Sequence, residues 1–133
     1  MFFDEEMLLD LRLNIMNKYV DKFIITEATY MHSGKNKKLV FDINKFSKFK
    51  DKIIYNVVDK QPVDIEIINK DDDNKTKGNK LIHNSIKREN YQREMAKKSL
   101  DDLQEEDIIL INDVDEIPNL DEINFKNINN KLI

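Results

Sequence analysis

The sequence reads Asp107-Ile-Ile-Leu-Ile-Asn-Asp-Val-Asp-Glu-Ile-Pro118 near its C-terminal end. Ile108 to Ile111 form an unbroken apolar run, which is typical of a strand buried on both faces inside a parallel sheet. Three carboxylates follow at once, on Asp113, Asp115 and Glu116. Open α/β sheets bind their ligands at the carboxyl ends of the strands. The stretch therefore predicts an α/β fold with an acidic site at one edge of a mainly parallel sheet.

The spacing of the two aspartates favours a metal site. Residues two apart on an extended chain point to the same side, so Asp113 and Asp115 can face one site while Val114 packs behind them. Carboxylates this close repel one another unless a cation lies among them. A hard divalent cation suits such a site because it prefers carboxylate oxygens and leaves positions open for phosphate oxygens. The alternative interpretation is an ordinary surface turn, since many turns contain an Asp-x-Asp triplet.

Composition limits the class of protein. The 133 residues allow one small domain, and the 40% of hydrophobic residues predict a globular fold. The 22 basic and 26 acidic residues give a net charge of -4 and are interleaved, so no basic face for nucleic acid is expected. The sequence has no cysteine, which excludes disulfides, thiolate metal sites and cysteine nucleophiles. Its two histidines lie far apart, which argues against a zinc site.

The sequence also shows no signal for membrane insertion or export. Its N-terminus lacks the basic region and apolar stretch of a signal peptide, and no segment approaches the ~20 apolar residues of a membrane span. We therefore expect a soluble, cytoplasmic protein without a membrane span.

Hydrophobic patterning predicts alternating helices and strands. Apolar spacings of three and four predict helices, and short β-branched and aromatic runs predict strands. In chain order we expect a helix from Asp4, as a possible N-cap, to Lys18, a strand at 22–27, a helical turn at 41–50, a strand at 52–58, a short edge strand at 63–67, a flexible loop at 69–79, and a long helix from Asn84 or Ser85 to Leu100. This order is that of an α/β unit with parallel strands.

A second group of candidate residues lies on the long predicted helix. Arg88 and Gln92 are one turn apart, as are Glu89 and Arg93, so each pair shares a face. The structural interpretation is an exposed Glu89–Arg93 ion pair that contributes about 0.3–0.5 kcal/mol. The functional interpretation has Arg93 binding a phosphate or orienting an aspartate, a task suited to a planar guanidinium.

A third group follows the first predicted strand. Glu27 stands at the strand end, and His32-Ser-Gly-Lys35 follows in a polar loop where Gly34 favours a turn or close approach to a ligand. The loop can be purely structural, or it can line a phosphate or sugar pocket. No Walker-type spacing is present, which excludes a P-loop.

Six ordered sequence blocks resemble glycosyltransferase family 17, whose best-known members are β-1,4-mannosyl-glycoprotein 4-β-N-acetylglucosaminyltransferases. The blocks are Glu5-x-x-Leu-Leu-x-Leu-Arg12-Leu-Asn, Val20-Asp-x-Phe-Ile-Ile-x-Glu27-Ala-Thr, His32-Ser-Gly-Lys35, Lys52-Ile-Ile-Tyr55, Glu89-x-x-Gln-Arg93 and Asp107-Ile-Ile-Leu-Ile-x-Asp-Val-Asp-Glu-Ile-Pro118.

The resemblance implies a GT-A-like (Rossmann-like) nucleotide-diphospho-sugar transferase fold, with residues 1–133 as the N-terminal, nucleotide-sugar-binding portion of one domain. It implies a hexosyltransferase similar to β-1,4-N-acetylglucosaminyltransferases of N-glycan processing. The implied donor is UDP-N-acetylglucosamine or a related UDP-sugar, and the implied acceptor is a glycan.

The resemblance also implies roles for particular residues. Asp115 would be the main ligand of a divalent metal, Mn²⁺ or Mg²⁺, and Asp113 would contact the ribose or the metal shell. Glu27 would lie near the uridine, and Arg93 would support the aspartates or the diphosphate. The general base is expected in the C-terminal half of the family's catalytic domain, so the resemblance assigns a catalytic role to none of residues 1–133.

Two other functions are compatible with these residues. The first is a truncated, catalytically silent module that binds a nucleotide or a partner. The second is a magnesium-dependent phosphotransfer protein that uses the same aspartates.

Overall fold

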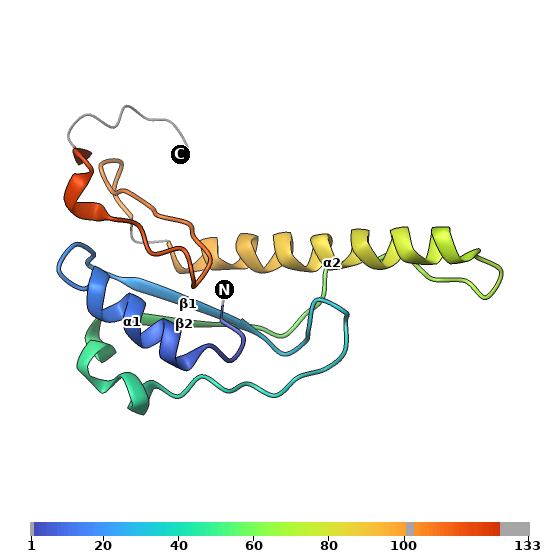
Figure 1. Ribbon diagram of the computed structural model, residues 1–133, viewed down its shortest axis with the longest axis horizontal. Coiled ribbons are helices and arrows are strands. Elements are labelled where there is room, and N and C mark those ends of the chain that lie inside the picture. The colour runs from blue at the N-terminus through green and yellow to red at the C-terminus, as the bar shows by residue number, and fades with distance from the viewer. Residues whose placement is uncertain (1, 101–102, 126–133) are drawn as a thin grey trace.

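A computed structural model describes residues 2–100 and 103–125. Two helices and several 3-10 segments surround a small sheet (Figure 1). In chain order the elements are α1 (Glu6–Met16), β1 (Phe23–Ala28), η1 (Ile43–Lys52), β2 (Ile53–Val58), α2 (Asn74–Ala96), η2 (Lys97–Ser99) and η3 (Leu120–Glu122). The predicted α/β class is confirmed.

The sheet consists of β1 and β2, which pair in parallel from Phe23 opposite Ile53 to Ala28 opposite Val58. Both strands lie close to their predicted ranges because their β-branched and aromatic residues suit a pleated, half-buried surface. Successive side chains of a strand face opposite sides, so β1 supplies two separate hydrophobic clusters. The sheet therefore has a packed layer on each face.

The larger hydrophobic cluster lies between the sheet, α1 and η1. Its buried members are Phe2, Leu9, Leu13, Met16, Phe23, Ile25, Phe46, Phe49 and Leu120. The smaller cluster joins Ala28, Tyr30 and Val58 to Tyr91 and Met95 of α2. Figure 1 accordingly shows η1 and α2 on opposite sides of the two strands. The helical turn predicted at 41–50 is confirmed as η1, and its Phe46 and Phe49 are buried in this cluster.

The predicted strand at Ile108–Ile111 is wrong within the part of the chain that the structure describes. These residues are irregular and exposed, at 48%, 48%, 38% and 59%. A strand needs a neighbouring strand as its hydrogen-bond partner, and an apolar run of four cannot specify one. Here the residues that follow the run are instead held by side chains of α1 and α2.

The predicted edge strand at 63–67 is also wrong. The backbone N–H and C=O of Glu66 pair with the side-chain amide of Asn84, both at 2.8 Å. This amide replaces the neighbouring strand that an edge strand would need, because it offers one acceptor and one donor. The segment is therefore held by α2 and not by the sheet.

The long helix begins ten residues earlier than predicted, so the flexible loop at 69–79 is wrong for its second half. The side chain of Asp73 accepts a 2.6 Å hydrogen bond from the backbone N–H of Thr76 and caps the first turn of α2. The helix ends at Ala96, and η2 follows it.

At the other end of the chain, the N-cap position of α1 belongs to Glu5 and not to the predicted Asp4. No helix among the described residues is long and apolar enough to cross a membrane.

Candidate active site at an acidic turn

The two aspartates of the Asp-x-Asp motif lie in a tight turn of residues 113–116. The backbone N–H of Glu116 donates to the carbonyl of Asp113 at 3.1 Å, which closes the turn. The carboxylate of Glu116 in turn accepts the backbone N–H of Asp113 at 3.0 Å. This acidic turn is thus stabilised by its own residues, and the role of Glu116 within it is structural.

Arg12 of α1 holds the backbone of the acidic turn. Its Nη1 donates to the carbonyl oxygens of Asp113, at 3.1 Å, and Glu116, and its Nη2 donates to Oδ1 of Asn112 at 3.2 Å. Burial lowers the pKa of Arg12, and the nearby carboxylates of Glu116 and Asp113 oppose that shift. Three acceptors around one guanidinium fix the direction in which the turn presents its carboxylates.

The residue type and spacing of Arg12 did not predict a role for it. It lies on the turn of α1 that carries the buried residues Leu9 and Leu13. An arginine beside the buried stripe of an amphipathic helix usually has a partner outside that helix, because a guanidinium is rarely buried alone. The position of Arg12 beside the buried stripe was therefore the sequence feature that could have predicted its partner outside the helix.

Arg93 of α2 holds a carboxylate of the turn. Its Nη2 donates to Oε1 of Glu89 and to Oδ1 of Asp113, both at 3.0 Å. Hydrogen bonding to Glu89 raises the pKa of Arg93, burial opposes this, and the charge of Asp113 raises it further. Arg93 therefore forms the expected ion pair with Glu89 and also contacts an aspartate of the turn, while its functional role stays a prediction.

Asp115 has the most open carboxylate of the motif. The residue is exposed and forms no hydrogen bond or ion pair with other described residues, whereas the carboxylate of Asp113 is bound by Arg93. Within residues 2–100 and 103–125, no three acidic or histidine side chains converge to form a metal cage. The donor set nevertheless fits Mg²⁺ or Mn²⁺, which proteins often bind through one or two carboxylates together with the phosphates of a substrate.

Glu27 lies apart from the acidic turn and is fully buried. Its Oε1 accepts from Lys37 Nζ and from the backbone N–H of Val40 at 2.9 Å. Its Oε2 accepts from the N–H of Phe41 at 3.1 Å and from the hydroxyl of Tyr55 at 2.7 Å. Burial raises the pKa of Glu27, but these four donors outweigh it and lower the pKa overall. In this structure, the carboxylate anchors residues 37–41 to the sheet.

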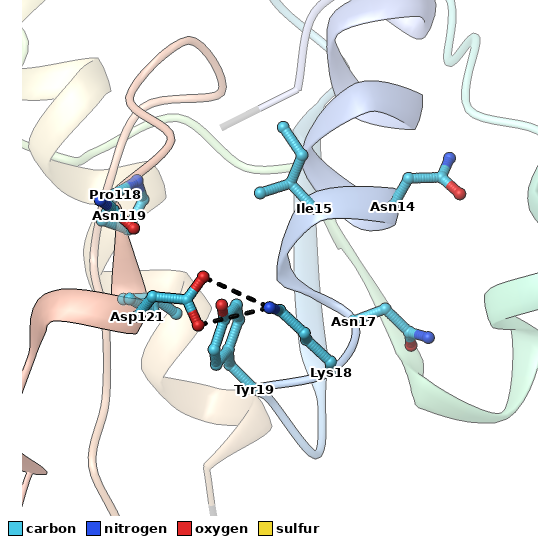
Figure 2. A pocket seen from close by; sticks show the side chains of 9 residues that line it. Asn14, Ile15, Asn17, Lys18, Tyr19, Pro118, Asn119 and Asp121 are labelled. Carbon is cyan, nitrogen blue, oxygen red and sulfur yellow. Dashed lines mark hydrogen bonds and ion pairs between the residues drawn. The ribbon is translucent and has the colours of Figure 1, made fainter.

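A hollow of about 400 Å³ lies between the end of α1 and residues 118–121 (Figure 2). Pro118 and Asn119 line one wall, and Asn14 and Lys18 line the other. Lys18 Nζ forms an ion pair with Asp121 at 3.3 Å across this hollow. No residue of the acidic turn lines this hollow, so the hollow is not part of the proposed site.

The fold and this site define an α/β protein in which arginines from two helices hold an Asp-x-Asp turn. A family model, Glycosyltransferase family 17, matches residues 1–131. The chain therefore belongs to glycosyltransferase family 17, as its six sequence blocks predicted. Comparison with curated proteins and with solved structures finds no match. Membership of this family makes the protein a transferase with a sugar donor and an acceptor.

Proposed function

We propose that the protein transfers N-acetylglucosamine, or a related sugar, from a UDP-sugar to a glycan acceptor. Asp113 and Asp115 bind the donor diphosphate together with Mn²⁺ or Mg²⁺. The observation that supports this most is the convergence of Arg12 and Arg93 on the acidic turn, in a chain of a glycosyltransferase family.

The two aspartates have different tasks in this proposal. Asp113 is positioned by Arg93, so its Oδ2 is the oxygen left for a ligand. Asp115 carries no such restraint and is the main metal ligand. When bound, the divalent cation supplies a Lewis acid that offsets the negative charge of the departing UDP.

The arginines contribute through their positive charge and their rigidity. Arg12 and Arg93 reduce the repulsion among the three carboxylates of the turn and keep the turn in one geometry before the donor arrives. Such preorganisation matters because a site that must rearrange on binding loses affinity. We further propose that residues 1–133 form the nucleotide-sugar-binding portion of a GT-A-like domain, with Glu27 near the uridine. In that portion, Glu27 acts by holding residues 37–41 in place.

Calorimetry with UDP-N-acetylglucosamine and Mn²⁺ tests the proposal. We expect saturable binding that requires the metal and is abolished by Asp115→Ala. Asp71→Ala is the matched control, because Asp71 is also an exposed aspartate and lies outside the acidic turn. Equal affinity in Asp115→Ala and the native protein would overturn the assignment of the site.

A further inference from the structure

Arg88 of α2 is a buried cation outside the acidic turn. Only 8% of the residue is exposed. Its Nε donates to Oε1 of Gln61 at 2.8 Å, and its Nη1 donates to the backbone carbonyl of His32 at 3.0 Å. His32 lies in the loop that follows β1 and Gln61 in the loop that follows β2. Arg88 thus joins both loops to α2.

The guanidinium of Arg88 lies directly against the backbone of Gly34. Gly34 has φ +85°, and a Cβ atom there would lie 2.5 Å from Nη2 and 2.8 Å from Cζ of Arg88. The loop is also closed by hydrogen bonds from Gly34 N to Met31 O and from Met31 N to Lys35 O, both 2.8 Å. A glycine is required here both for its backbone conformation and for the space that the arginine occupies.

The charge of Arg88 has no counter-charge among the described residues. Both of its hydrogen-bond acceptors are neutral, and none of the ion pairs in that part of the chain involves Arg88. Its Nη2 has no hydrogen-bond partner there either, and it is not completely shielded from solvent. A buried charge without a counter-charge is costly, and an anion at Nη2 offsets that cost.

The position of Arg88 is one where α/β proteins bind ligands. The two loops that it joins leave the carboxyl ends of the parallel strands β1 and β2, which is the ligand-binding edge of open α/β sheets. A guanidinium with an unpaired amino group that solvent still reaches suits the oxygens of a phosphate. Lys35, in the same tight loop as Gly34, and Lys60, next to Gln61, are exposed and add positive charge to this edge.

We propose that Arg88 and the Gly34 loop form an oxyanion site for a phosphate group, separate from the acidic turn. Phosphate reaches Nη2 of Arg88 while Nε and Nη1 keep Gln61 and His32 in place. The site needs no metal. Arg88 and Arg93 are five residues apart on one helix, so their Cα atoms lie about 7–8 Å apart along the axis of α2.

NMR spectroscopy of the full chain in EDTA tests this site. The probes are inorganic phosphate and inorganic pyrophosphate, added at an ionic strength held constant with chloride. We expect saturable shifts of the Arg88 Nε–Hε signal and of the Gly34 amide. Saturation by pyrophosphate alone assigns the site to a diphosphate, and saturation by both assigns it to a single phosphate group. The absence of saturable shifts with either anion would overturn the proposal.

Variants locate the response. Arg88→Lys removes the Nε–Hε signal, which assigns it, and retains a weaker shift at Gly34 because it keeps the charge. Arg88→Gln abolishes the shift at Gly34, whereas the control Lys98→Gln, an exposed cation near the end of α2, retains it. An unchanged response in a folded Arg88→Gln protein would contradict the site. Asp115→Ala retains the response, so failure of the metal site and failure of this site are distinguishable.

Discussion

Arg93 Nη2 lies 3.0 Å from Asp113 Oδ1, and this contact joins α2 to the acidic turn across 20 residues of sequence. The same nitrogen also binds Glu89, one helical turn away. A single guanidinium thus connects a local helical pair to the candidate active site.

Arg93→Gln tests the importance of that contact for binding. The side chains of Arg93 and Asp113 are 33% and 48% exposed, so the free energy of unfolding should change by less than about 1 kcal/mol. Affinity for UDP-N-acetylglucosamine with Mn²⁺ should fall about tenfold, because Asp113 loses its orientation. Glu89→Gln is the control, since it weakens the helical pair and leaves the contact with Asp113. Calorimetry showing equal losses in both variants would contradict a role for Arg93 in orienting Asp113.

Arg12→Gln should affect both stability and binding. Arg12 donates to two backbone carbonyls and one side-chain oxygen in a partly buried place, so its loss should lower the free energy of unfolding by about 1–3 kcal/mol. Urea denaturation measures this change. Arg12→Lys should recover part of the lost stability but a smaller part of the metal-dependent binding. The compact ammonium lacks the planar set of donors with which the guanidinium reaches all three acceptors. Full recovery of binding in Arg12→Lys would show that charge alone suffices.

Glu27→Gln should be strongly destabilising. The substitution leaves Lys37 buried without its counter-charge and places an amide donor among four other donors, at an expected cost of about 3–5 kcal/mol. Glu6→Gln is the matched control, because it also breaks a glutamate–lysine pair, with Lys45, but on the surface. That control should change the free energy of unfolding by no more than about 1 kcal/mol. Similar effects of the two substitutions would refute the anchoring role of Glu27.

The carboxylate of Glu27 should also make the free energy of unfolding depend on pH. Folding lowers the pKa of Glu27 from its ordinary value of 4.5. Its ionised form therefore stabilises the fold above that value, and the contribution is lost as the pH falls through the lower pKa of the folded state. The stability difference between the native protein and Glu27→Gln should be constant near neutral pH and should narrow in acid. Urea denaturation across that range tests this, and a difference that grows in acid would have the wrong sign.

The two glycines should respond to alanine in opposite directions. Gly34→Ala places a Cβ against Arg88 at positive φ, so it should cost at least about 1–2 kcal/mol of unfolding free energy. Gly78 lies inside α2 with open space around its Cβ position, so Gly78→Ala should stabilise the protein by roughly 0.4–1 kcal/mol. Equal effects of the two substitutions would contradict the close approach of Arg88 to Gly34.

Local sequence patterns were sufficient to predict those elements that can be recognised without knowing which distant residues they contact. The β-branched runs at 22–27 and 52–58 became β1 and β2, and the apolar spacing of the first helix became α1. The Glu89–Arg93 pair follows from helical geometry alone. The Asp-x-Asp motif could be located in the same way, since it is defined by residue type and spacing, but its role as a metal site stays a prediction.

Features that depend on contacts with distant residues could be determined only from the tertiary structure. Ile108–Ile111 has the composition of a strand, but no neighbouring strand pairs with it among the described residues. Glu27 and Arg12 received their structural roles from donors and acceptors elsewhere in the sequence. The physical reason is the same in each case: propensity acts within a few residues, whereas a hydrogen-bond ladder or a buried charge needs a partner that only the tertiary fold brings within reach.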